Sequence, residues 1–250
     1  MLGLGSQVKG HIERRFGMVW QSPGPRMKEV VMAMREIWKT WQTGRRLDFN
    51  GDYYKLSLMT PFFSPGPIEH PKIPVFVAGV NEGMGKVAGE VGDGLHVHPL
   101  HTTRYLREVL HRGLLEGLHR SGRTRGDVQV AVSVFVAVGK SQREIELARE
   151  ACREQVAFYA STRTYRKVME IHGWGDVCER LHKLSVEGKW DKMGGEVGDE
   201  MLDEFLTEGT WDEIGGILRE RYRGLADRVR LYLPFDGREE WKKLTSGFRA

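Results

Sequence analysis

The sequence has 250 residues, of which 40% are hydrophobic and 29% charged, with 31 glycines and 2 cysteines. This length and apolar content allow one large domain or two small ones, and they exclude a disordered chain. The net charge of +4 permits an anionic ligand, but the basic residues are dispersed among acidic ones and form no footprint for nucleic acid.

No apolar stretch approaches the length of a transmembrane helix, and Met1–Ser6 lacks the basic flank of a signal peptide. Cys152 and Cys178 form no CxxC pattern, which argues against a disulfide scaffold or a structural zinc site. We therefore expect a cytoplasmic protein that binds neither membranes nor nucleic acid.

The N-terminal half alternates between strand and helix patterns. Residues 1–5 predict the end of a strand, and apolar side chains at the helical period predict an amphipathic helix over 25–42. Ser22 is the predicted cap of this helix, and Gly44 its end. Asn50-Gly51 predicts a hairpin, and the proline-rich residues 60–74 predict an irregular connection.

Four further segments continue the alternation. We predict strands over 74–79 and 93–98, and helices over 81–90 and 102–119. The clearest strand covers 128–138, where valine recurs at every second position and mostly small residues occupy the other face. That pattern is typical of a strand between a helical layer and a filled barrel interior.

The C-terminal half contains two capping boxes. Ser141–Glu144 predicts a helix to about 159, and Thr210–Glu213 predicts one to about 222. Residues 160–207 look helical, and 228–233 predict a last strand. The order of elements predicts an α/β protein with five core parallel strands, too few for a closed eight-stranded barrel. We expect one domain over 1–235, with a helical insertion at about 140–207, and a frayed polar tail over 236–250.

Several segments together resemble a known family. Leu2–Ser6, the strand Pro74–Gly79 and the segment Ala88–Gly94 resemble the bacterial luciferase-like monooxygenases. More narrowly, they resemble the branch that uses the deazaflavin coenzyme F420. Phe158–Thr162, His172–Gly175 and Leu184–Trp190 resemble one subgroup of that branch. The resemblance implies a (β/α)8 barrel of the TIM type with the cofactor across the carboxyl ends of the strands. It also implies an oxidoreductase that transfers hydride between coenzyme F420 and a small organic substrate, with an FMN-dependent monooxygenase as the alternative.

The resemblance further implies that the chain begins at the fourth strand of this barrel. We therefore expect a partial barrel whose open edge favours a homo-oligomer. The alternative is a non-catalytic fragment or subunit that needs a partner to complete the barrel.

Two strand ends carry the predicted cofactor contacts. Gly79, Val80 and Asn81 end a strand and open a helix, where backbone N–H groups and the helix dipole suit a phosphate. The resemblance implies that these residues contact the cofactor's phosphate, and an ordinary strand-to-helix turn is the alternative. Ser6 and Gln7 follow the first strand and are placed to touch the cofactor's ring or ribityl chain, unless they only cap and solvate the turn.

Histidines mark the third predicted strand. His96, His98 and His101 suggest a zinc site, but no acidic partner stands at ligand spacing, so we predict no metal. We predict instead that His98 is catalytic and donates or shuttles a proton beside the cofactor, with a partly buried strand histidine as the alternative. Arg163 and Arg166 suit an anionic cofactor tail, but a solvated helix face explains them as well.

Overall fold

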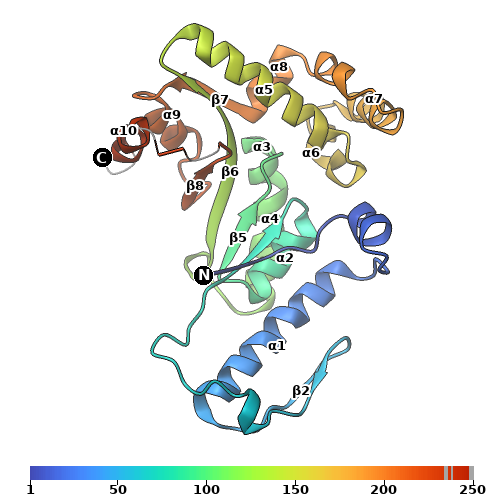
Figure 1. Cartoon of the computed structure of the whole chain (residues 1–250), viewed down its shortest axis with the longest axis vertical. Coiled ribbons are helices and arrows are strands. Elements are labelled where there is room, and N and C mark those ends of the chain that lie inside the picture. Colours follow the sequence, from blue (N-terminus) through green and yellow to red (C-terminus); the bar gives the residue numbers. More distant parts are fainter. Residues whose placement is uncertain (234–235, 238, 248–250) are drawn as a thin grey trace. The chain divides into compact units, whose positions relative to one another are not determined.

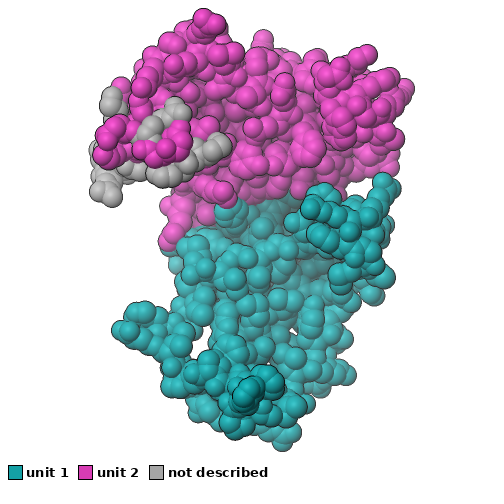
Figure 2. All heavy atoms as spheres, in the orientation of Figure 1, with its two compact units in different colours: residues 1–96, 112–129 teal, residues 97–111, 130–250 magenta. Residues whose placement is uncertain are grey.

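The computed structural model describes residues 1–233, 236–237 and 239–247. Residues 234–235 of the predicted domain, and 238 and 248–250 of the predicted tail, lie outside the described residues. The chain divides into two compact units, coloured separately in Figure 2. Unit 1 holds residues 1–96 and 112–129, and unit 2 holds residues 97–111 and 130–250. The prediction of a single domain over 1–235 stays a prediction.

The elements alternate between strands and helices (Figure 1). The strands are β1 (Leu2–Leu4), β2 (Phe49–Asn50), β3 (Lys55–Leu56), β4 (Val75–Gly79), β5 (Gly94–Val97), β6 (Gln129–Gly139), β7 (Leu206–Thr210) and β8 (Arg228–Leu231). The α-helices are α1 (Pro23–Thr43), α2 (Glu82–Val91), α3 (Thr103–Tyr105), α4 (His111–Arg120), α5 (Gln142–Ala160), α6 (Arg166–Glu170), α7 (Gly175–Val186), α8 (Asp199–Phe205), α9 (Ile214–Arg221) and α10 (Glu240–Gly247). A π-helical stretch, Leu106–Leu110, joins α3 to α4.

Unit 1 is organised by the parallel pairing of β1 with β4. Leu2 lies opposite Val75 and Leu4 opposite Val77. The side chains of Val75, Phe76 and Val77 are buried, as expected of a strand that is covered on both faces. The helix α2 packs on β4 and α1 packs on α2, so unit 1 is a layer of parallel strands covered by helices.

Glycines bring α2 and α4 into backbone contact. A methyl group on Gly89 would lie 2.8 Å from the amide nitrogen of Leu118, and one on Gly117 would lie 2.9 Å from the carbonyl carbon of Lys86. An ion pair between the two helices lies next to this contact, with Lys86 Nζ of α2 2.7 Å from Glu116 Oε1 of α4. The close approach depends on the missing side chains, which fixes the path of α2.

Unit 2 is organised by β6. This strand pairs in parallel with β8 along Ala131–Val134 and with β7 along Phe135–Gly139. Its residues are buried from Val130 onward, on both faces. The predicted position of this strand between two covered faces is confirmed.

The strand β7 is an additional strand that the sequence analysis did not predict. The helical segment ends with α8 at Phe205, and Leu206–Thr210 forms a strand. This segment contains a glycine, a glutamate and two threonines, so it shows no clear strand periodicity of its own. Its extended structure comes from hydrogen bonds with a distant partner, β6, which local sequence patterns do not reveal.

Of the two predicted capping serines, Ser141 caps its helix and Ser22 does not. Ser22 precedes α1, but its side chain makes no capping hydrogen bond. Ser22 has a left-handed backbone with a φ of 45°, not the extended backbone of a capping residue, and Pro25 at the third helical position lacks the N–H group that a cap would bind. At α5 the prediction is confirmed, because the Ser141 hydroxyl accepts a hydrogen bond from Glu144 N–H at 3.3 Å.

The predicted frayed tail is also corrected. Within its described residues, Glu240–Gly247 form the helix α10, which packs on α9. Leu244 is buried, and the Trp241 ring meets the Trp211 ring edge to face at 5.5 Å. Apolar contact with unit 2 therefore orders a segment that is polar on average. None of the described helices is long and apolar enough to cross a membrane.

We expect Gly89→Ala to lower the free energy of unfolding by about 1–3 kcal/mol, because the new methyl group would overlap the backbone of α4. Gly83→Ala in the same helix is the matched control, since nothing lies within 4 Å of that position. Urea unfolding followed by circular dichroism measures both changes. Equal losses in the two variants would contradict close packing at Gly89.

Candidate functional site

The structure brings five predicted cofactor residues to one edge of unit 1. Ser6 and Gln7 follow β1, and Gly79–Asn81 end β4 and lead into α2. Because β1 and β4 are parallel and in register, both segments lie at the carboxyl edge of the strands. A methyl group on Gly5 would contact Ala78 Cβ at 3.4 Å, which shows how closely the two strand ends approach.

Gly79 is required by its surroundings. A methyl group there would lie 2.9 Å from Met84 Cβ and 3.2 Å from Leu95 Cδ1. The glycine lets the backbone turn directly from β4 into α2, and Val80 next to it is buried.

Asn81 occupies the N-cap position of α2 with an extended backbone. Its carbonyl oxygen accepts hydrogen bonds from the N–H groups of Met84 and Gly85, both at 3.1 Å. Its side chain makes no capping bond with the helix. The N–H groups of Glu82 and Gly83 at the start of α2 and the Asn81 side-chain amide are therefore suited to an external anion.

One acidic residue stands in the first turn of α2, and a cation compensates it. Arg112 Nε donates a hydrogen bond to Glu82 Oε1 at 3.0 Å, and this bond raises the pKa of Arg112. Pairing reduces the repulsion that the Glu82 carboxylate would exert on an anion. The residues of the turn thus fit a phosphate group.

Ser6 and Gln7 form a strained end to β1. Gln7 has a φ of 61°, in the left-handed region that non-glycine residues rarely adopt. Its Oε1 lies 3.1 Å from His11 Nδ1, and the Ser6 hydroxyl donates a 3.3 Å hydrogen bond to the Gln7 carbonyl. The Gln7 side chain therefore engages His11, whereas Ser6 is half-buried at the edge next to the β4–α2 turn.

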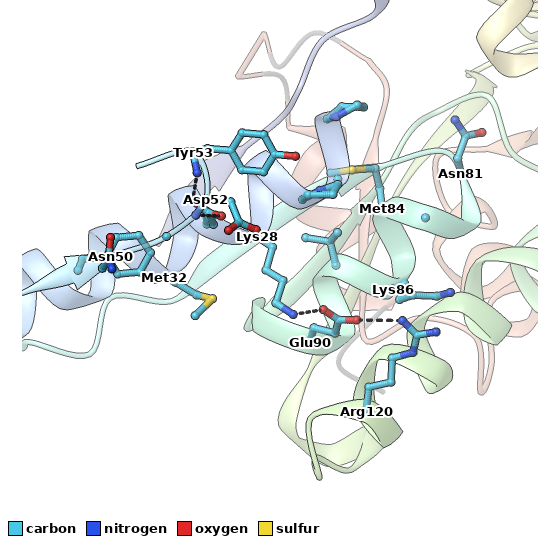
Figure 3. A pocket seen from close by; sticks show the side chains of 18 residues that line it. Lys28, Met32, Asn50, Asp52, Tyr53, Asn81, Met84, Lys86, Glu90 and Arg120 are labelled. Carbon is cyan, nitrogen blue, oxygen red and sulfur yellow. Dashed lines mark hydrogen bonds and ion pairs between the residues drawn. The ribbon is translucent and has the colours of Figure 1, made fainter. Parts of the chain in front are cut away.

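A cavity of about 770 Å³ opens beside this turn, between α1, the β2–β3 hairpin and α2 (Figure 3). Of the predicted site residues it includes Asn81, but not Ser6, Gln7, Gly79 or Val80. Figure 3 shows Glu90 between two cations, with Lys28 Nζ at 2.7 Å and Arg120 Nη1 at 3.8 Å. The lining thus combines apolar side chains with an internally paired charge cluster.

The sequence analysis missed the residue that holds the hairpin over this cavity. The Glu29 carboxylate accepts hydrogen bonds from three consecutive hairpin N–H groups, those of Asp52 at 2.8 Å, Tyr53 at 2.9 Å and Tyr54 at 3.1 Å. Asn50-Gly51 marked the hairpin itself, but no local signal links it to a glutamate in α1. Desolvation raises the pKa of Glu29, but the hydrogen bonds outweigh it and hold this pKa below its ordinary value.

In unit 2, His98 follows β5 and is half-buried. Its Nδ1 accepts a hydrogen bond from Leu100 N–H at 3.1 Å, so in the neutral ring the hydrogen sits on Nε2. The ring meets Tyr159 edge to face at 4.8 Å and tilts against Tyr165 at 4.5 Å. His98 therefore holds its ring hydrogen on Nε2, among aromatic side chains.

The hydroxyl groups of Tyr159 and Tyr165, which surround His98, keep their hydrogens. The hydroxyl groups of Tyr159 and Tyr232 lie 2.6 Å apart. Burial and this hydrogen bond raise the pKa of Tyr159, and burial raises the pKa of Tyr165. A cavity of about 520 Å³ adjoins Tyr159 and Tyr232, with Arg230 in its lining.

The other candidates from the sequence have structural partners. His101 is buried, and burial lowers its pKa to about 4. The part of the chain that the structure describes holds no group of three or more metal-ligating side chains. Arg166 pairs with Glu170 at 2.6 Å and also with Glu179, so its charge is compensated within the helical segment.

Comparisons with known proteins identify relatives of this chain. The pattern of the luciferase-like monooxygenase family matches residues 1–228, which confirms the resemblance inferred from the sequence. An uncharacterized protein of Mycobacterium tuberculosis is 49% identical over 229 residues, which cover 92% of this chain and 67% of that protein. A 5,10-methylenetetrahydromethanopterin reductase of Archaeoglobus fulgidus is 28% identical over 210 residues, which cover 82% of this chain and 58% of the reductase.

A solved structure has the same fold. The coenzyme F420 dependent tetrahydromethanopterin reductase from Methanopyrus kandleri matches with a TM-score of 0.74 at 19% identity, over 99% of this chain and 72% of that chain. At this identity the likeness shows the fold alone. It confirms the predicted α/β fold, similar to the barrels of the luciferase type.

We expect Glu29→Gln to speed hydrogen–deuterium exchange of the amides of residues 52–54, because a neutral amide replaces the carboxylate that accepts their bonds. Since the pKa of Glu29 is lowered on folding, its stabilising contribution is present above the unfolded pKa. That contribution is lost as the pH falls through the folded pKa. Glu36→Gln, which removes a carboxylate from the same helix, should leave these amides unchanged. Unaltered exchange in Glu29→Gln would show that the hairpin is held by other contacts.

Proposed function

Because the chain belongs to the luciferase-like monooxygenase family, a family of oxidoreductases and monooxygenases, we propose that it binds coenzyme F420 and supports hydride transfer between this coenzyme and a small organic substrate. The observation that carries the proposal is the β4–α2 turn. There Gly79 ends β4, which lies beside the end of β1, and the N–H groups of Glu82 and Gly83 and the Asn81 side-chain amide follow it.

In this proposal the chain's own residues bind and orient the coenzyme. The turn at Gly79, Val80 and Asn81 holds a phosphate group through backbone N–H donors and the helix dipole. Ser6, at the same edge, accepts a hydrogen bond from the polar part of the coenzyme, because its own hydrogen is bonded to the Gln7 carbonyl. When bound, the coenzyme supplies a ring that accepts or releases hydride, and the protein positions that ring.

His98 is proposed to donate a proton to the substrate. The Leu100 N–H bond leaves the ring hydrogen on Nε2. A proton that His98 shuttles from Nε2 to the substrate is replaced on the ring by one from water, so that the imidazole stays neutral. Tyr159 and Tyr165 pack against the ring and limit its access to water. The hydrogen on Nε2 is therefore the one available to the substrate.

The choice of F420 over FMN is supported by the relatives. The Methanopyrus kandleri protein with this fold is described as a coenzyme F420 dependent tetrahydromethanopterin reductase. The related Archaeoglobus fulgidus protein is a 5,10-methylenetetrahydromethanopterin reductase. FMN and a monooxygenase reaction remain the competing outcome of the test below.

The test is a titration of the full chain with coenzyme F420 and, separately, with FMN, followed by fluorescence. We expect saturable binding of F420 and weaker binding of FMN. Asn81→Asp should weaken F420 binding about tenfold or more, because a carboxylate at the N-cap would repel the phosphate. Ser141→Asp places the same residue at the N-cap of α5 and should bind like the parent chain.

Each other result selects a different function. Tighter binding of FMN would assign the chain to the flavin-dependent reaction. Binding of neither coenzyme by a folded sample would favour a subunit that needs a partner to complete its barrel. Equal effects of Asn81→Asp and Ser141→Asp would remove the β4–α2 turn from the proposed site.

We also propose that the chain forms homo-oligomers through residues 58–63 of unit 1. Leu58 is 78% exposed, Phe62 90% and Phe63 71%, an unusual concentration of apolar surface for a monomer. The double variant Phe62→Ser/Phe63→Ser is expected to shift sedimentation velocity toward monomers. Leu147→Ser, at a residue of unit 2 that is 65% exposed, is the matched control. A parent chain that sediments as a monomer would contradict the proposal.

A further inference from the structure

A buried histidine lies three residues after His98 and has no part in the proposed binding of the coenzyme. The His101 side chain is 1% exposed, and burial lowers its pKa to about 4, so it is neutral at physiological pH. A neutral imidazole has one donor and one acceptor nitrogen. The partners of these two nitrogens decide what the ring does.

The first partner is the backbone of His98. His101 Nδ1 lies 2.8 Å from the His98 carbonyl oxygen, and a carbonyl only accepts, so Nδ1 carries the hydrogen. The second partner is Tyr222, whose hydroxyl lies 3.2 Å from His101 Nε2. Since Nε2 is then the acceptor, the Tyr222 hydroxyl donates. Burial raises the pKa of Tyr222 to about 12, so this hydroxyl keeps its hydrogen.

Hydrogen bonds therefore hold the segment after β5 at several neighbouring residues. The His98 carbonyl is held by His101, and His98 Nδ1 accepts from Leu100 N–H. Thr102 is tied as well, because its hydroxyl lies 2.8 Å from His172 Nε2 and accepts from Tyr105 N–H. The His98 ring cannot turn without breaking the bond from Leu100 N–H, and the His98 carbonyl cannot turn away without breaking the bond from His101.

We propose that His101, held by Tyr222, is a positioning residue that fixes the backbone of His98 and thereby keeps the His98 hydrogen on Nε2. The inference rests on the proposed proton-donating role of His98, but it can be tested without that role. It predicts that the tautomer of one histidine depends on the hydrogen bond made by another.

Nitrogen chemical shifts of the ¹⁵N-labelled full chain report the tautomer of each histidine ring, and His98→Gln assigns the His98 signals. In the parent chain His98 Nδ1 should show the shift of an unprotonated nitrogen. In His101→Leu both bonds of the buried ring are lost, and the two His98 nitrogens should move toward an average value. His101→Asn keeps a donor at the Nδ1 position and should restore most of the parent shift.

The same variants are then assayed for hydride transfer. His101→Leu is expected to lower kcat about 10²-fold with little change in KM for the coenzyme, because a misplaced donor affects the reacting geometry and not the phosphate site. His101→Asn should recover most of the loss. The matched control is His182→Leu, which removes another Nδ1 bond to a carbonyl, that of Ser161 at 3.0 Å, in the helical segment.

The outcomes separate the two proposals. Parent-like His98 shifts in a folded His101→Leu chain would overturn the positioning role, as would equal changes in His182→Leu. If His101→Leu does not fold, Tyr222→Phe tests the same proposal, because it removes the hydrogen bond that the Tyr222 hydroxyl donates to the His101 ring. Unaltered His98 shifts in Tyr222→Phe would also overturn the positioning role of His101. If His98→Gln leaves kcat unchanged while the shifts behave as expected, His101 still positions His98, but the proton-donating role of His98 is wrong.

Discussion

The parallel ladder between β1 and β4 is the constraint on which the candidate cofactor site depends. Only three residue pairs make it, from Leu2–Val75 to Leu4–Val77. A slip of one residue would move Ser6 along the edge by about 3.3 Å and turn its side chain to the other face. The ladder thus determines that two segments more than 70 residues apart end side by side.

Close helix packing determines where the first turn of α2 points. Gly79 allows β4 to turn directly into the helix, and Gly89 and Gly117 allow α2 and α4 to meet backbone to backbone. Side chains at these positions would push the helix away and move its N–H groups from the edge of the strands. The missing side chains therefore keep the first turn of α2 at the edge of the strands.

In unit 2 the chemistry of the histidines follows from their hydrogen-bond partners. His98 and His101 are three residues apart, yet one is half-buried with the hydrogen on Nε2 and the other is buried with the hydrogen on Nδ1. A zinc site would require both rings to turn a lone pair toward one point. Instead, one nitrogen of His101 is bonded to the His98 carbonyl and the other to the Tyr222 hydroxyl, an arrangement that holds the His98 backbone in place.

The sequence by itself determined the features that depend on neighbouring residues. Helical periodicity located α1, alternating valines located β6, and Ser141 was recognised as a cap because its partner is three residues away. Motif order was enough to identify the family. Only the tertiary structure decided that Leu206–Thr210 is a strand, that Glu29 holds the β2–β3 hairpin and that Tyr222 orients His101. Each of these features depends on a hydrogen-bond partner distant in the chain, and a long-range partner leaves no periodic pattern in the local sequence.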